Sequence, residues 1–201
     1  MIKSFVALAM AGLLALGPAQ ADSTEEAEAF VVALVEELKT LAERDGEGSP
    51  AMRAALEENH DTRRIGQELV AKRSAETAGP EHMERYNALF PAYIAAAYAK
   101  DIGRLAAREI KVTRSLERRP GDLVIESELY DDRGAKRASI AWRVSVSRDG
   151  EHRLFDVLVA GTSQLITRRQ IFSDIIKREG FDGLLTQMQE TIDAGVVIED
   201  D

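Results

Sequence analysis

The stretch Asp156–Leu185 reads DVLVAGTSQLITRRQIFSDIIKREGFDGLL and combines an apolar strand, a tight turn and a helix. The apolar residues that follow Asp156 are typical of a buried strand. Gly161 permits a sharp turn because it has no Cβ atom, and Thr162 or Ser163 can cap the first turn of the helix that follows. Gly180 is suited to the position that ends the helix. The stretch therefore predicts a strand–turn–helix unit against which the rest of the chain packs.

The predicted helix carries a charge within its apolar face. Four residues are spaced so that they share one side of a helix: Leu165, Arg169, Phe172 and Ile176. A guanidinium group among apolar side chains is costly unless it is paired. We expect Arg169 to form a buried structural ion pair with Asp156 or Asp182. The alternative is that Arg169 binds a phosphate group, to which the planar guanidinium can donate two hydrogen bonds.

The ordered motifs of this stretch resemble the MlaC-type periplasmic phospholipid-binding proteins, also called the toluene-tolerance family. The family pattern is Asp-Val, Gly-x-Ser, Arg-x-x-Phe and Gly-x-Asp-Gly-Leu. Its positions here are Asp156, Val157, Gly161, Ser163, Arg169, Phe172, Gly180, Asp182, Gly183 and Leu184. The order of elements agrees with the family from about Ala27 to Leu185. The chain departs from it at residues 72–75, where Lys-Arg-Ser-Ala stands in place of Gly-Arg-Tyr-Trp, and at His152, where Trp is usual.

The resemblance implies a carrier that takes phospholipid between an outer-membrane lipoprotein–porin complex and an inner-membrane ABC transporter with its substrate-binding-domain subunit. Such a carrier maintains the lipid asymmetry of the outer membrane, holding the acyl chains between sheet and helices with the headgroup outside. Three alternatives stay open: a carrier of another hydrophobic lipid such as a hopanoid, a structural adaptor with a filled core, and a small-ligand isomerase-like enzyme that uses Asp156. The net charge of −9 argues against nucleic acid as a partner.

The N-terminal residues 1–21 are expected to form a cleaved signal peptide. Lys3 supplies the basic start, the apolar run at residues 5–16 is too short to span a bilayer, and Ala19-Gln20-Ala21 precedes the predicted cleavage site. The sequence contains no cysteine, which excludes disulfides and an N-terminal lipid-modified cysteine. We expect residues 22–195 to form one lipid-binding domain in the periplasm, followed by an acidic tail at residues 196–201.

Helical periodicity dominates the chain up to about residue 105. Ser23 should cap the first helix, Ser49-Pro50 and Asp61 should start the next two, and Gly79-Pro80 should open a long one. Pro91 should kink that helix or split it in two. The tyrosines of the long helix are interpreted either as ordinary core residues or as part of a cavity wall.

Alternation of apolar and polar residues replaces the helical period after residue 105. It predicts strands around residues 110–116, 123–129, 138–146 and 154–159, with turns at residues 119–122, 131–134 and 149–150. We therefore expect an α+β fold in which helices pack over one face of a four-stranded twisted antiparallel sheet and enclose an apolar cavity.

The expected cavity wall combines apolar residues of the sheet and of the helices. Its predicted members are Leu34, Leu89, Tyr93, Tyr98, Ile102, Val112, Ile125, Trp142, Val144 and Val157. Structural roles are expected for Asp156, Gly161, Ser163, Arg169 and Phe172. No cofactor and no metal is expected, because His60, His82 and His152 lack the spacing of metal ligands.

Overall fold

The computed structural model describes residues 18–46, 48–106, 109–131, 133–147 and 149–194, without the side chains of residues 18–22 and 100–106. The predicted tail and most of the predicted signal peptide lie outside the described residues. The elements are α1 (Pro18–Asp45), α2 (Pro50–Asn59), α3 (Thr62–Leu69), α4 (Lys72–Ala106), β1 (Glu109–Arg119), β2 (Asp122–Tyr130), β3 (Lys136–Val146), β4 (His152–Val159), β5 (Thr162–Ser163) and α5 (Gln164–Ala194). Among these residues, no helix is long and apolar enough to cross a membrane.

The strands form one antiparallel meander in the order β1-β2-β3-β4-β5, which confirms the predicted α+β fold. Ile125 lies opposite Trp142, which in turn lies opposite Val157, so these inward residues form a row across the sheet. The two-residue β5 was not predicted. It pairs with the end of β4 after a turn in which Ala160 and Gly161 both have positive φ, at 49° and 82°. The prediction that Gly161 makes the turn is confirmed.

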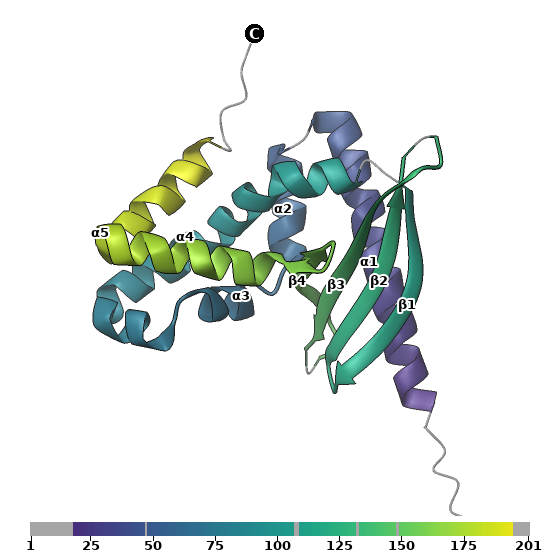
Figure 1. Cartoon of the computed structure of the whole chain (residues 1–201), viewed down its shortest axis with the longest axis horizontal. Coiled ribbons are helices and arrows are strands. Elements are labelled where there is room, and N and C mark those ends of the chain that lie inside the picture. Colours follow the sequence, from purple (N-terminus) through teal and green to yellow (C-terminus); the bar gives the residue numbers. More distant parts are fainter. Residues whose placement is uncertain (1–17, 47, 107–108, 132, 148, 195–201) are drawn as a thin grey trace, which may run out of the picture.

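The helices form two groups around the sheet (Figure 1). The long α1 lies along the sheet and contacts β1 and β2. The helices α4 and α5 run side by side away from the sheet, α3 packs against both, and α2, α3 and α5 contact β4. This arrangement places α1, α2 and the end of α4 on the inner face of the sheet, while α3 and α5 pack at its β4 end.

The predicted helix starts are confirmed for α2 and α3. The Ser49 hydroxyl accepts a hydrogen bond from the Met52 amide at 3.3 Å, and the Asp61 carboxylate accepts one from the Arg64 amide at 3.1 Å. The expected start of the first helix is wrong, because α1 begins at Pro18 rather than after Ser23.

The two longest helices, α4 and α5, are broken at glycines rather than at proline. The backbone of α4 leaves helical geometry at Gly79, with φ 81° and ψ 174°, and the helix then continues through Pro91. Of the two outcomes predicted for Pro91, a kink or a split, the split is therefore wrong. The packing of the buried Phe90 and Tyr93 holds the helix together although one N–H donor is missing. In α5, Gly180 breaks the helix as predicted, with φ 75°, but a further helical segment follows it directly.

Two apolar clusters make up the core. The sheet-side cluster joins α1, α2 and the end of α4 to the inner face of the sheet; its buried members are Ala27, Val31, Leu34, Val35, Leu38, Met52, Ala55, Leu56, Ala95, Ala99, Leu123, Ile125, Leu129, Ile140, Trp142, Val144, Leu154 and Val157. The helix-side cluster joins α3, α4 and α5; its buried members are Ile65, Leu69, Val70, Tyr86, Phe90, Tyr93, Ile94, Phe155, Leu165, Phe172, Ile175, Phe181, Leu184, Leu185 and Met188. Tyr98 packs against both clusters.

Candidate functional site

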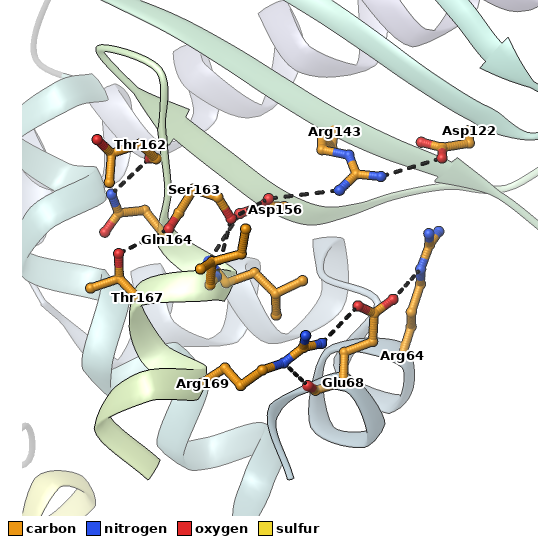
Figure 2. A network of polar contacts seen from close by, with 12 residues as sticks. Arg64, Glu68, Asp122, Arg143, Asp156, Thr162, Ser163, Gln164, Thr167 and Arg169 are labelled. Atoms are coloured by element: carbon orange, nitrogen blue, oxygen red, sulfur yellow. Dashed lines mark hydrogen bonds and ion pairs between the residues drawn. The ribbon is translucent and has the colours of Figure 1, made fainter. Parts of the chain in front are cut away.

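The N-terminus of α5 is held to β4 by polar contacts (Figure 2). The Asp156 carboxylate accepts hydrogen bonds from the Leu165 amide at 3.0 Å and from the Ser163 hydroxyl at 2.7 Å. The Ser163 hydroxyl in turn accepts a hydrogen bond from the Ile166 amide at 3.1 Å. Asp156 and Ser163 therefore both cap the helix, in agreement with the structural roles expected for them.

Arg143 connects this cap to the next strand. Its guanidinium lies 3.9 Å from the Asp156 carboxylate and 3.3 Å from that of Asp122, while the Asp156 side chain is only 2% exposed. A general base must reach the proton that it abstracts. The Asp156 carboxylate is instead occupied by two donors and a cation, which argues against the catalytic role considered for it.

Two guanidinium groups lie near the ring of Phe155, the residue before Asp156 on β4. The Arg64 Cζ atom is 3.5 Å and the Arg143 Cζ atom 4.4 Å from the centre of its ring. The electron-rich faces of an aromatic ring attract cations. This stack joins α3 to β3 and β4 and so fixes how the helical layer meets the sheet.

Arg169 does not form the buried ion pair predicted for it. Its guanidinium binds the backbone carbonyl and the carboxylate of Glu68 on α3, the latter at 3.2 Å, and its side chain is 46% exposed (Figure 2). Asp182, the other predicted partner, lies 3.2 Å from His82 and 3.5 Å from Arg85. The prediction was wrong because the helical period places Arg169 at the border of the apolar face, from which its long stem reaches α3.

The neighbouring Arg168 is the functional candidate that sequence reasoning missed. Its Nη1 atom donates a hydrogen bond to the Tyr93 hydroxyl at 3.0 Å, and its Cζ atom lies 5.3 Å from the centre of the Tyr98 ring. Burial raises the pKa of both tyrosine hydroxyls, while Arg168 opposes that rise. Both rings therefore stay neutral phenols. The sequence signal that could have identified it is the pair of adjacent arginines, Arg168 and Arg169. The spacing of the apolar residues on the helix favoured Arg169 instead.

The residues of the predicted cavity wall are divided between the two clusters. Leu34, Ile125, Trp142, Val144 and Val157 are buried in the sheet-side cluster, against which Val112 packs while partly exposed. Tyr93 is buried in the helix-side cluster and Leu89 packs against it. Tyr98 contacts both clusters, and the Ile102 side chain lies outside the described residues. Phe172, for which a structural role was expected, is buried in the helix-side cluster at 1% exposure.

The polar groups within the sheet-side cluster are few. The Trp142 Nε1 atom donates a hydrogen bond to the Ser127 hydroxyl at 2.8 Å, which satisfies the one polar atom of the indole. His60 lies at the border between the clusters, where its ring stacks on Tyr98 with centroids 6.1 Å apart. Burial lowers the pKa of His60 to about 4, partly offset by its hydrogen bond to the Leu56 carbonyl. His60 is therefore uncharged at neutral pH.

A surface hollow of about 290 Å³ is lined by Leu89, Arg85 and Leu185, among others. Two more lie between α5 and the segment before and around the break in α4. One of about 460 Å³ is lined by His82, Gly180 and Phe181, among others, and one of about 360 Å³ by Leu69, Arg169 and Ile176, among others. Neither is lined by the predicted wall residues. In the part of the chain that the structure describes, no group of three or more His, Cys, Asp or Glu residues could hold a metal ion.

The sequence matches the MlaC protein family over residues 25–190. The chain belongs to the MlaC family. Its fold is similar to a solved structure of the phospholipid-binding protein from Ralstonia solanacearum in complex with a phospholipid, with a TM-score of 0.63 and 19% sequence identity. The similarity covers 85% of this chain and 99% of that one. Among curated proteins, none matches the chain.

Membership of the MlaC family indicates binding or transport rather than catalysis. The matched range includes α2 to β5, most of α1 and most of α5, so it contains both clusters and the polar cap of α5. The engaged state of Asp156 agrees with that classification.

Proposed function

We propose that this MlaC-family chain is a periplasmic phospholipid carrier that shuttles lipid between an outer-membrane lipoprotein–porin complex and an inner-membrane ABC transporter. The observation that carries the proposal is the family match over residues 25–190. The fold similarity to a protein solved with a bound phospholipid supports the ligand class.

The chemistry of the sheet-side cluster suits acyl chains. Burying one CH₂ group is worth about 0.8 kcal/mol, so a chain of about 16 carbons gains roughly 12 kcal/mol on leaving water. A bilayer offers the lipid the same free-energy gain. The affinity of a carrier for the acyl chains therefore has to be similar to that of the bilayer, and it need not be higher. Aliphatic side chains with few polar atoms provide such surroundings, and apolar pockets of this kind need few polar groups to orient their ligand.

The proposed acyl-chain site is the part of the predicted wall in and beside the sheet-side cluster. It comprises Leu34, Tyr98, Val112, Ile125, Trp142, Val144 and Val157, with Leu89 and Tyr93 on the adjoining helix-side cluster. Ile102 stays a predicted member on the sequence alone. Opening the site requires the aliphatic residues of α1 and of the sheet to move apart as the chains enter.

Lipid analysis of the purified protein tests this function. The chain, expressed in an envelope with its own signal peptide, should copurify from the periplasmic fraction with phospholipid, detected by solvent extraction and mass spectrometry. A hopanoid without phospholipid would establish the alternative ligand, and lipid-free protein that also fails to take up phospholipid from vesicles would refute the carrier function.

A matched pair of variants locates the acyl-chain site. Val144→Glu places a carboxylate on the inner face of the sheet, where Val144 is fully buried, and should abolish copurified phospholipid in the folded fraction. Val124→Glu places the same charge on the opposite face, across from Arg143, and should retain it. Equal lipid content in the two folded variants would show that the wall lies elsewhere.

The proposed partners are tested by transfer. Fluorescent phospholipid loaded on the carrier should pass faster to vesicles containing the inner-membrane transporter than to empty vesicles. Because the chain carries a net charge of −9, higher salt should change the on-rate for that transporter more than the lifetime of the complex. Equal transfer to both kinds of vesicle would remove the transporter as a partner.

A further inference from the structure

Arg168 differs from its neighbour Arg169 in how its charge is compensated. Arg169 is paired with the Glu68 carboxylate. Within the described part of the chain, no carboxylate lies within 4.0 Å of the Arg168 guanidinium, and the interactions of Arg168 are those with Tyr93 and Tyr98. Both tyrosines are neutral phenols, so the positive charge of Arg168 has no counter-ion among the described side chains.

The guanidinium is accessible despite its partly buried position. Its Nη1 atom donates a hydrogen bond to the Tyr93 hydroxyl and the guanidinium also hydrogen-bonds to the Tyr98 hydroxyl, while guanidinium has five N–H donors in all. In the part of the chain that the structure describes, no nitrogen of Arg168 is both buried and without a hydrogen-bond partner. Two hydrogen bonds to tyrosines leave part of these five donors for a ligand that arrives from solvent, because the Arg168 side chain is partly exposed.

Arg168 lies where the polar headgroup of an amphipathic ligand would leave the apolar cluster that holds its acyl chains. Its guanidinium lies against Tyr98, the side chain at which the two clusters meet. The buried carboxylate of Asp156 acts on Tyr98 but is already engaged by Ser163, Leu165 and Arg143. A negative group at the edge of the sheet-side cluster would thus meet an uncompensated cation.

The geometry points to Arg168 as the ligand of the phosphate diester in the headgroup of the bound lipid, with Tyr93 holding the guanidinium in place. This inference rests on the proposed function. Guanidinium donors match phosphate oxygens in a two-point arrangement, and hydrogen bonds between charged partners are roughly twice as strong as neutral ones. A single accessible arginine anchors the headgroup at the surface and still allows release, because the phosphate keeps its other oxygens in water.

The test compares two lipids that differ only at the phosphate. Wild-type protein, Arg168→Met and Arg169→Met are equilibrated with vesicles containing either phosphatidylglycerol or diacylglycerol with identical acyl chains, and bound lipid is measured. Arg169→Met removes the same charge one residue away and is the matched control. Arg168→Met should weaken binding of phosphatidylglycerol at least tenfold, which corresponds to about 1.4 kcal/mol. Its binding of diacylglycerol should stay within about twofold of the wild-type value, as should both values for Arg169→Met.

Several outcomes overturn the assignment. Equal losses for both lipids would show that Arg168 only supports the fold of the apolar site, and unchanged phosphatidylglycerol binding would show that the headgroup does not contact it. If Arg168→Met fails to fold by circular dichroism, Arg168→Lys decides, because it keeps the charge without the planar donors. A headgroup-dependent loss in that variant supports the assignment, and its absence refutes it.

Inorganic phosphate distinguishes a headgroup site from a site for a free anion. Millimolar phosphate should not raise the melting temperature of the lipid-free wild-type protein. An Arg168-dependent rise without any difference between the two lipids would assign the cation to a free anion instead. Wild-type protein that binds neither lipid would refute the carrier function itself, whereas protein that binds both equally would refute only the role of Arg168.

Discussion

The two apolar clusters differ in the kind of side chain that fills them. Apart from Trp142, the buried members of the sheet-side cluster are aliphatic or methionine residues from strands and from α1, α2 and α4. The helix-side cluster contains six aromatic residues, and ring centroids of neighbours such as Tyr93 and Phe172 lie 5.5 Å apart. Aromatic pairs in such geometries add about 0.5–1.5 kcal/mol each beyond the area they bury. The side chains of the helix-side cluster are therefore held in more definite relative positions than those of the sheet-side cluster.

This difference assigns distinct tasks to the two halves of the core. Interlocked rings hold α4 and α5 in one arrangement and so fix the position of Arg168 and Tyr98. Aliphatic side chains have no such fixed pair geometry, which makes the sheet-side cluster better able to open for a flexible acyl chain. The predictions below test whether the clusters differ in this way.

The largest loss is expected for Phe172→Ala in the helix-side cluster. Phe172 is 1% exposed and packs against Tyr86 and Tyr93, so its removal should cost about 3–5 kcal/mol of unfolding free energy. Urea denaturation measures it. Ile171→Ala is the control, because Ile171 is 44% exposed and its truncation should change stability by about 0.5 kcal/mol or less. A small loss for Phe172→Ala would mean that the rings do not hold the helices together.

The border between the clusters should make stability depend on pH. His60 has a pKa of about 4 when folded against 6.5 as its ordinary value, so the unfolded chain takes up a proton that the folded protein rejects. Stability due to the neutral His60 is complete above pH 6.5 and is lost as the pH falls towards 4. Between pH 7 and pH 5 the loss should be about 2 kcal/mol.

His60→Gln provides the matched control for this pH dependence, because glutamine does not titrate. The difference in unfolding free energy between wild type and variant, followed by urea denaturation at several pH values, should change over this window. Parallel curves for the two proteins would contradict a neutral buried His60.

A smaller effect is expected for Ile125→Val in the sheet-side cluster. Removing one methyl group from this fully buried residue should cost about 0.5–1.5 kcal/mol in the lipid-free protein, as measured by thermal or urea unfolding. A cost near 3 kcal/mol would instead show that this cluster is packed as tightly as the aromatic one, and it would weaken the comparison between them.

The smallest effect is expected for Arg169→Met. The ion pair with Glu68 is 46% and 41% exposed at its two side chains, so its loss should cost less than about 1 kcal/mol. Urea denaturation in low and in 1 M salt measures it, and the difference between the proteins should shrink in high salt. A loss near 3 kcal/mol at both salt concentrations would contradict an exposed, weak ion pair and would show that Arg169 stabilises the fold as strongly as a buried pair.

The sheet and the cap of α5 could be predicted because they depend on local signals. Alternation marks the inner face at Ile125 and Trp142, and the Gly161–Ser163 turn marks the start of α5. The short β5 could not be predicted, because two residues carry no periodic pattern. The helical segment before Gly79 was also missed, since its sequence KRSAETA has no apolar stripe.

The candidate site was less predictable than the fold. Alternation identifies which residues point inward, but it does not show which other inward residues they meet. Leu89 and Tyr93 were therefore grouped with Val144, although they belong to the helix-side cluster. The partner of Arg169 was likewise set by the position of α3, and the sequence around Glu68 gives no sign that α5 packs beside it.

The strand order also has a consequence for how the chain reaches this structure. Each strand of the meander pairs with the strand next to it along the chain, so the sheet can assemble from successive hairpins whose loops are short. Short loops cost little closure entropy, and local contacts favour fast formation. The contacts of α1 with β1 and β2 join parts of the chain that are far apart in sequence. The sheet is therefore expected to form early in folding, and its apolar inner face stays exposed until the N-terminal helix docks.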